Sequence, residues 1–217
     1  MKIFLDTADV SIITKHFETG LIDGVTTNPT LIMKSGRDPE DVYQELAEAG
    51  VRDISMEVVG NSDTMTSEGL RLASKFQEVA TIKVPCSPDG LLTCAHLSRD
   101  GIKVNVTLIF DAAQAILAAK AGATYVSPFV GRLDDNSVNG LDVIKDIHDI
   151  YQTHWVKTQI LSASIRGVKA VSTSFALGAQ VVTMPPSVFE KMYNHVLTDK
   201  GLQLFDADWA SVVAQTK

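Results

Sequence analysis

The sequence alternates short apolar, β-rich runs with longer amphipathic stretches from one end to the other. This alternation is typical of βα units wound around a parallel sheet. About eight of the runs qualify as strands, which is the number that closes a TIM barrel. The strands are expected at Lys2–Leu5, Gly24–Thr27, Asp53–Val58, Thr81–Val84, Lys103–Leu108, Thr124–Ser127, Thr158–Ser162 and Gln180–Thr183.

Helices are expected between these strands, several of them opened by residues suited to helix starts. Examples are Asp41–Ala49, Thr64–Gln77, Asp111–Ala121 and Val138–Tyr151. Beyond the last strand, apolar residues recur at helical spacing over Leu202–Val213. We therefore expect one α/β domain over residues 1–217, a (β/α)8 barrel with an extra C-terminal helix at 198–217 that covers the barrel or a neighbouring subunit.

The chain of 217 residues is short for a barrel, which commonly takes about 250, so its loops should be short. A doubly wound open sheet is the structural alternative. That fold would often carry a glycine-rich GxGxxG turn after a strand. No such turn is present in the sequence, and the barrel is therefore favoured.

Composition limits the partners of the chain. Hydrophobic residues make up 45% and charged residues 21%, as in globular proteins. The net charge of -7 argues against a nucleic-acid partner, because binding the phosphate backbone needs clustered Lys and Arg. The opening residues include acidic side chains and lack the long apolar stretch of a signal peptide or membrane span, so we expect a cytoplasmic protein with no membrane partner. Cys86 and Cys94 lack the spacing of a zinc site or disulfide framework.

Polar residues follow almost every expected strand, although buried parallel strands are normally near-continuous apolar runs. In a barrel these strand ends converge on one face. We expect them to share a cavity with one cation and two carboxylates. The residues concerned are Asp6, Asn28, Glu57, Lys83, Asn105, Thr107 and Ser127.

Two of these residues have a purely structural alternative. Asp6 is placed to cap a helix that starts near Ala8, and Asn28 precedes a proline in a common turn dipeptide. For each of them, the sequence supports the structural role and a role in the site equally.

Lys83 stands between Ile82 and Val84 in an expected strand, where lysine is rarely buried. Desolvation favours the neutral, nucleophilic form of an amine, which Schiff-base catalysis requires. The alternative is a structural salt bridge between Lys83 and Glu57. The residues alone support the two interpretations equally.

Six segments carry these polar positions: Leu5–Ala8, Gly24–Pro29, Ile82–Pro85, Asn105–Leu108, Pro128–Arg132 and Ala163–Arg166. Together they resemble the small transaldolases and the closely similar fructose-6-phosphate aldolases, over essentially the whole chain. The sequences GVTTNP and IKVP at this spacing are specific in combination. The resemblance favours Lys83 as the nucleophile.

The resemblance implies an enzyme in which Lys83 forms an imine with a sugar phosphate. It implies that Asp6 is the acid/base at the C4 hydroxyl and that Glu57 and Thr107 hold the catalytic water. No metal or cofactor is implied. The residues it assigns to substrate binding are Thr26, Asn28, Asn105, Ser127 and Phe129, with Arg132, Ser164 and Arg166 at the phosphate. The five histidines fall in helical or loop stretches away from strand ends, so no class II metal site is expected: His16, His96, His148, His154 and His195.

Two positions favour transaldolase over aldolase. Members that act as aldolases carry Gln where this chain has Glu57 and Tyr where it has Phe129. The resemblance thus implies transfer of dihydroxyacetone from sedoheptulose 7-phosphate or fructose 6-phosphate to glyceraldehyde 3-phosphate or erythrose 4-phosphate, in the pentose phosphate pathway. Rival interpretations are a lyase that releases dihydroxyacetone and a non-catalytic sugar-phosphate-binding barrel. The family also implies a homo-oligomer, a pentamer or a decamer.

Overall fold

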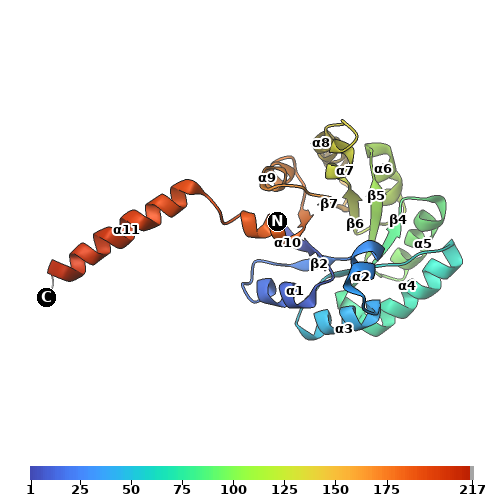
Figure 1. Cartoon of the computed structure of the whole chain (residues 1–217). Helices are drawn as coiled ribbons and strands as arrows, with labels where there is room; N and C mark the ends of the chain where they lie inside the picture. The colour runs from blue at the N-terminus through green and yellow to red at the C-terminus, as the bar shows by residue number, and fades with distance from the viewer. Residues whose placement is uncertain (216–217) are drawn as a thin grey trace.

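Eight parallel strands close into a barrel in chain order, β1 to β8, in the computed structural model, which describes residues 1–215 (Figure 1). The closed barrel is confirmed and the open sheet is excluded. Every expected strand overlaps an observed one. The strands are β1 (Lys2–Asp6), β2 (Gly24–Thr26), β3 (Ile54–Glu57), β4 (Ala80–Pro85), β5 (Val104–Ile109), β6 (Tyr125–Pro128), β7 (Gln159–Ser162) and β8 (Val181–Met184).

Helices form a ring outside the strands (Figure 1). Several begin at a side chain that caps free backbone N–H groups: Asn61, Ser87 and Asp111 accept such bonds at the starts of α4, α5 and α6. The helices of the barrel are α1 (Val10–Phe17), α2 (Pro29–Ser35), α3 (Pro39–Glu48), α4 (Ser62–Phe76), α5 (Pro88–Arg99), α6 (Ala112–Lys120), α7 (Val130–Asp134), α8 (Gly140–Thr153), α9 (Val168–Ala176) and α10 (Pro186–Lys191), with a 3₁₀ turn at Gln77–Val79.

Two separate apolar clusters stabilise the barrel. The larger lies between the strands and the helices and includes Leu5, Val25 and Ile82. The smaller contains Phe4 and Tyr125, together with Leu161, Ala163 and Val181. Tyr125 also donates a 2.8 Å hydrogen bond to the buried carboxylate of Asp53. Tyr125 and Val181 begin their strands, whereas Ala163 follows the carboxyl end of β7. This smaller cluster therefore extends along the barrel interior from the amino ends toward the carboxyl ends of the strands.

Two neighbouring strands, β4 and β5, alternate between apolar and polar residues. In β5, Val104 and Val106 belong to the outer cluster, whereas Asn105 and Thr107 between them are buried polar residues. Successive side chains of a strand point to opposite sides of the sheet. Asn105 and Thr107 therefore face the barrel interior, and the polar interior begins well before the strand ends.

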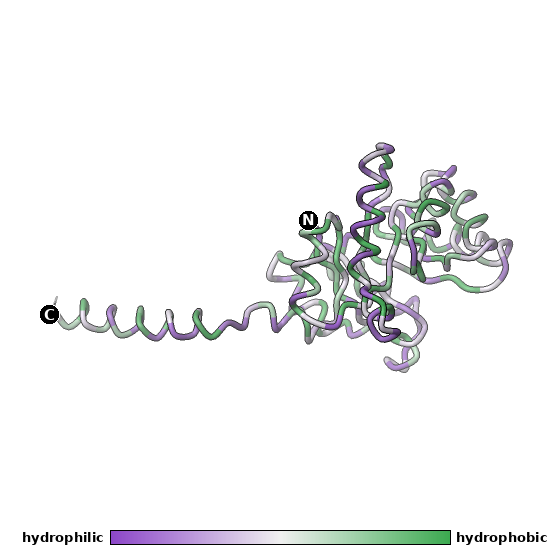
Figure 2. Tube along the Cα trace, turned by 90° about the horizontal axis from the view of Figure 1, so that it is seen from above, coloured by the Kyte–Doolittle hydropathy of each residue, from purple (hydrophilic) through white to green (hydrophobic). Residues whose placement is uncertain are grey.

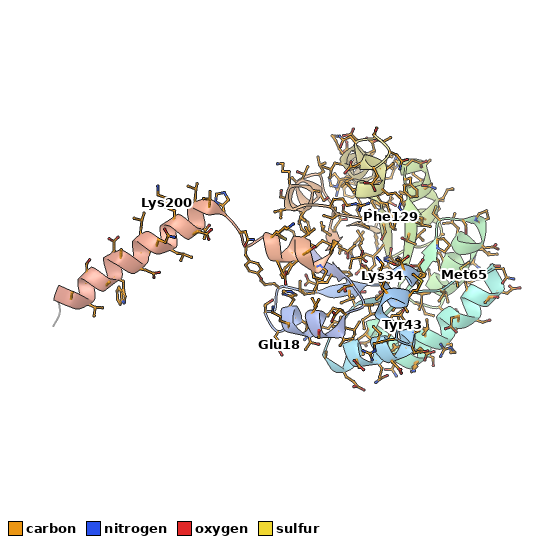
Figure 3. All side chains as sticks on the ribbon, in the orientation of Figure 1. Glu18, Lys34, Tyr43, Met65, Phe129 and Lys200 are labelled. Carbon is orange, nitrogen blue, oxygen red and sulfur yellow. The ribbon has the colours of Figure 1, made fainter. Side chains whose placement is uncertain are left out.

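The C-terminal helix α11 (Val196–Gln215) projects away from the barrel (Figure 1). Its side chains, Lys200 among them, stand clear of the ring of helices (Figure 3). Phe205 and Trp209 are 71% and 69% exposed, and apolar positions recur along the helix (Figure 2). The last two residues of the expected 198–217 segment lie outside the described residues. Among residues 1–215, no helix is long and apolar enough to cross a membrane.

Candidate active site

Lys83 lies inside the barrel on β4 and is only 5% exposed. Its Nζ donates hydrogen bonds to Glu57 Oε2 at 2.8 Å and to the carbonyl oxygen of Thr27 at 2.9 Å. Glu57 is its direct partner on the neighbouring strand β3. The salt bridge considered as the structural alternative is thus present. It also gives the amine a carboxylate within proton-transfer distance.

Two adjoining cavities open beside Lys83. The first measures about 120 Å³ and the second about 380 Å³. Both are lined by Asn28, Lys83, Thr107, Phe129 and Arg132, and Glu57 lines the second. Pockets for drug-sized ligands occupy roughly 300–1,000 Å³, so the first cavity suits a short fragment. The remainder of a longer ligand would extend into the second.

Asp6 ends β1 and lines the smaller cavity. Burial raises the pKa of its carboxyl group above the ordinary value, while the hydrogen bond from Thr26 and the charge of Lys83 lower it and the charge of Glu57 raises it. The cap of α1 is Asp9, whose side chain accepts a bond from the N–H of Ile12. The carboxylate of Asp6 is therefore not used as a helix cap.

Asn28 combines both functions that the sequence left open. Its Oδ1 accepts the backbone N–H of Leu31 at 3.0 Å and so caps α2. The same side chain lines both cavities. With its oxygen engaged by the helix, the amide nitrogen is the atom that can donate to a ligand.

A buried amide is held between two serines beneath the cavity. Ser127 Oγ donates to Asn105 Oδ1 at 2.7 Å, and Asn105 Nδ2 donates to Ser55 Oγ at 3.2 Å. All three residues are almost completely buried, and Asn105 pairs with Lys83 across β4 and β5. Ser55, absent from the predicted set, fixes the orientation of the Asn105 amide.

Thr107 carries an unsatisfied group. Within the described residues, its buried Oγ1 has no hydrogen-bond partner, although Thr107 lines both cavities. A buried hydroxyl without a partner costs on the order of 1–3 kcal/mol. A bound water or ligand oxygen next to Lys83 would remove that cost.

Arg132 and Ser164 both line the smaller cavity. The Arg132 guanidinium lies 4.8 Å from the centre of the Phe129 ring. Gly131 donates its N–H to the carbonyl oxygen of Ser164 at 3.0 Å, and a Cβ on Gly131 would lie 2.1 Å from that oxygen. Only glycine permits this approach. Ser164 itself adopts a φ of 59°, which is strained for a non-glycine residue.

Of the predicted site residues, all but Asn105 and Arg166 line one of the two cavities. Asn105 reaches the site through Ser127. The Arg166 side chain is 63% exposed and forms an ion pair with Asp135, so it is directed to Asp135 and not into either cavity. Thr183 lines the smaller cavity and was not predicted, although it ends an expected strand just as the predicted residues do.

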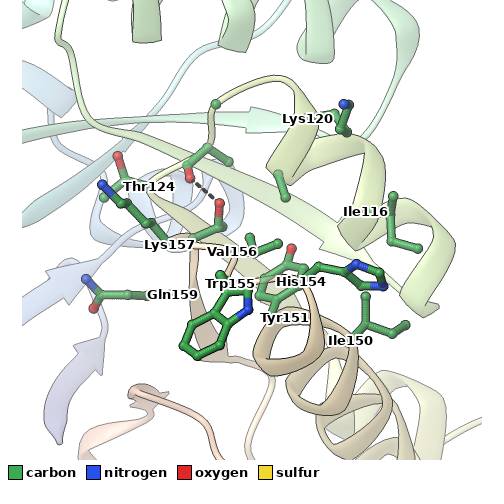
Figure 4. Close-up of a pocket in the computed structure, with 14 residues that line it drawn as sticks. Ile116, Lys120, Thr124, Ile150, Tyr151, His154, Trp155, Val156, Lys157 and Gln159 are labelled. Carbon is green, nitrogen blue, oxygen red and sulfur yellow. Dashed lines mark hydrogen bonds between the residues drawn. The ribbon is translucent and has the colours of Figure 1, made fainter.

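A larger hollow of about 850 Å³ lies elsewhere, between α6 and α8 near the amino ends of β6 and β7 (Figure 4). Tyr151, His154 and Trp155 line it, and Trp155 is 90% exposed. None of the predicted site residues lines it. The predicted residues that line the two cavities therefore lie at the opposite end of the barrel.

Comparisons with known proteins identify the family to which the chain is similar. The family described as Transaldolase/Fructose-6-phosphate aldolase matches residues 3–216. A "Probable transaldolase" of Paracoccus denitrificans (strain Pd 1222) is 52% identical over 211 residues, covering 97% of both chains. "Probable transaldolase" proteins of Caulobacter vibrioides and Dinoroseobacter shibae are each 50% identical, covering 97% and 96% of both chains respectively.

Proposed function

Because the chain belongs to the transaldolase/fructose-6-phosphate aldolase family, we propose that it is a transaldolase that carries a dihydroxyacetone unit covalently on Lys83. The observation that carries this proposal is the buried amine of Lys83, which faces a cavity and contacts the carboxylate of Glu57. A desolvated lysine beside a proton acceptor has the properties that imine formation needs.

In the first half of the reaction, the amine attacks the C2 carbonyl of a ketose phosphate. Glu57 takes one proton from the protonated amine of Lys83 before the attack and a second from the same nitrogen after it. It passes both protons in turn to the C2 oxygen, which leaves as water when the imine forms. The hydroxyl of Thr107, which has no hydrogen-bond partner among residues 1–215, supports a position for that water beside Glu57. The result is a protonated imine on Lys83.

Asp6 then removes the proton from the C4 hydroxyl. The C3–C4 bond breaks, its electron pair passes into the imine, and the C4 carbon leaves as the aldehyde of an aldose phosphate. The three-carbon enamine remains on Lys83. An incoming aldose phosphate reverses these steps, so ping-pong kinetics are expected. The substrates carried over from the family resemblance are sedoheptulose 7-phosphate or fructose 6-phosphate as donor, and glyceraldehyde 3-phosphate or erythrose 4-phosphate as acceptor.

Two residues favour transfer over release of the fragment. Phe129 presents a ring without a hydroxyl at the cavity wall, and it packs against Phe110 with ring centres 5.9 Å apart. The ring of Phe129 offers no donor to protonate the enamine. Glu57 occupies the position where aldolase members carry Gln.

An assay with and without acceptor tests this function. With fructose 6-phosphate and erythrose 4-phosphate, we expect sedoheptulose 7-phosphate as the product. With the donor alone, free dihydroxyacetone should appear far more slowly than the transfer product does. Equal rates of release would make the chain an aldolase. Donor binding with neither product would favour the sugar-phosphate binder.

Arg132 is proposed to bind the substrate phosphate, because guanidinium groups bind phosphate through paired hydrogen bonds. Replacing Arg132 by Gln should lower kcat/KM for phosphorylated donors by about tenfold to hundredfold, with little effect on unphosphorylated dihydroxyacetone as donor. Steady-state kinetics with both donors measure this difference. Equal losses for both donors would place the phosphate elsewhere.

Two further variants complete that experiment. Arg166 is also proposed at the phosphate, and Arg166→Gln should show a similar preference if Arg166 leaves Asp135 on binding. Arg71→Gln is the matched control, because Arg71 pairs with Glu40 and Glu68 on the surface. It should leave the kinetics with both donors unchanged.

The single-domain arrangement over residues 1–217 and a homo-oligomer, pentamer or decamer, are also proposed. The apolar side chains exposed on α11, Phe205 and Trp209 among them, support a role for this helix in covering a neighbouring subunit. Sedimentation or light scattering measures the subunit number. A cytoplasmic location remains a prediction that suits a family of metabolic enzymes.

A further inference from the structure

Three hydrogen-bonded side chains cross neighbouring strands at the carboxyl end of the barrel. Thr26 Oγ1 lies 2.8 Å from Asp6 Oδ1 and 2.7 Å from Thr183 Oγ1. Asp6 ends β1, which pairs with β2 on one side and β8 on the other. All three side chains line the smaller cavity. Thr26 and Thr183 are each only 3% exposed.

The direction of these bonds follows from counting protons. A threonine hydroxyl has one proton to donate and two lone pairs, whereas an ionised carboxylate only accepts. When Asp6 is ionised, Thr26 gives its single proton to Asp6. The bond between the two threonines must then be donated by Thr183. The chain runs from Thr183 through Thr26 to Asp6.

We infer that Thr183 is a positioning residue for cleavage of the C3–C4 bond: by donating to Thr26, it keeps the Thr26 hydroxyl directed at the carboxylate of Asp6. This inference rests on the function proposed above. Without the donor at Thr183, the Thr26 hydroxyl is free to rotate away from Asp6. Hydrogen bonds in a chain also polarise one another, so Thr183 strengthens the bond that Thr26 makes.

This positioning matters because Asp6 must be ionised to act as a base, and its burial disfavours the ionised form. Burial raises the pKa of the Asp6 carboxyl, and the Thr26 hydrogen bond is the strongest influence that lowers it. Lys83 of β4 also lowers this pKa and Glu57 of β3 raises it. Arg132 of α7 is the further charged side chain that lines the smaller cavity. The two strands that pair with β1 contribute hydroxyl groups here, one each.

The same chain accommodates the protonated form of Asp6. After Asp6 takes the proton of the C4 hydroxyl, it can donate to Thr26, which can then donate to Thr183. The three hydroxyl and carboxyl groups reverse their bonds without moving a heavy atom. Within the described residues, the Thr183 hydroxyl has no hydrogen bond other than that with Thr26, so the chain of hydrogen bonds ends there. Its function is to orient a group and not to carry the proton to solvent.

The pH dependence of donor cleavage tests this inference. In Thr183→Val, which keeps the shape of the side chain and removes the hydroxyl, the acid limb of kcat/KM should move up by about half a pH unit. The rate then falls about threefold on the acid side and little at the alkaline plateau. Thr183→Ser should restore the wild-type profile. A loss of equal size at every pH, or no shift at all, would overturn the inference.

A buried hydroxyl pair outside the site provides the control. The Oγ atoms of Ser162 and Ser174 lie 2.9 Å apart, and neither residue lines either of the two cavities. Ser174→Ala should leave the acid limb where it is in the wild type. A shift as large as that of Thr183→Val would mean that any lost buried hydroxyl has this effect, and the inference would fail.

A titration of the Asp6 carboxyl carbon by ¹³C NMR gives a readout that needs no turnover. The titration midpoint should be higher in Thr183→Val than in the wild type, and an equal midpoint refutes the inference. Thr183→Ala replaces the valine variant if the latter does not fold. If the wild type fails to cleave any ketose phosphate, the proposed function is wrong, while the titration still decides whether Thr183 acts on Asp6.

Discussion

Replacing Lys83 by Met is expected to abolish transfer of dihydroxyacetone, to below about one ten-thousandth of the wild-type kcat. Methionine retains most of the length of the lysine side chain but has no amine to form the imine. It also leaves Glu57 without its ion-pair partner. Coupled assays of transfer measure the loss. Substantial residual turnover would rule out covalent catalysis by Lys83.

Borohydride reduction shows whether the loss is chemical. In the wild type, reduction with fructose 6-phosphate should add mass to the peptide that contains Lys83, and in Lys83→Met it should add none. Lys75→Met is the control, because Lys75 is a surface lysine paired with Glu40. In that variant, borohydride should still add mass to the peptide that contains Lys83, and the transfer activity should equal that of the wild type. A mass increase located on another lysine would contradict the assignment.

Replacing Asp6 by Asn should lower donor cleavage by about 10²-fold to 10⁴-fold, the usual contribution of a general acid or base. Asparagine keeps the size of the side chain and cannot accept the C4 proton. Imine formation at Lys83 uses Glu57 and should persist, so borohydride trapping separates the two steps. If cleavage and trapping were lost together, Asp6 would act before the bond breaks.

The pH profile gives an independent check on Asp6. Because burial raises the pKa of its carboxyl, the ionised base is lost at a higher pH than for an exposed aspartate. Cleavage by the wild type should therefore decline, as the pH falls, before an ordinary carboxyl near pH 4 would protonate. Asp6→Asn should lack this limb. Asp9→Asn is the control, since asparagine caps a helix about as well as aspartate, and its profile should match the wild type.

The barrel was predictable because each strand carries its own signal. Eight separate apolar runs, each followed by an amphipathic stretch, leave few other ways to bury the chain. Most of the residues that line the cavities were predictable for a related reason. The ends of parallel strands in a barrel are buried, so polar side chains there reach solvent or a ligand only through a cavity. Lys83, Glu57 and Thr107 all obey this rule, and the family resemblance supplied their proposed functions.

The remaining features depend on distances that a sequence does not contain. Thr183 lies near a strand end, as Asp6 does. Its hydrogen bond to Thr26 forms because β8 and β2 both pair with β1, which brings the two threonines together inside the barrel. The ion pair between Arg166 and Asp135 joins two loops of different βα units. The direction of α11 could not be predicted either. The periodicity of its apolar residues predicts that one face of the helix is buried by another surface, but it does not identify that surface.

The alternation along β4 and β5 separates the residues that pack against the helices from those that face the cavities. In β5, Val104 and Val106 contact the helices, while Asn105 and Thr107 face the chemistry. A substitution at an inward polar position such as Thr107 therefore changes what the barrel does while leaving the outer apolar cluster almost unchanged. Descendants of such a chain can acquire new reactions one inward residue at a time, on a scaffold whose stability is set by the other half of each strand.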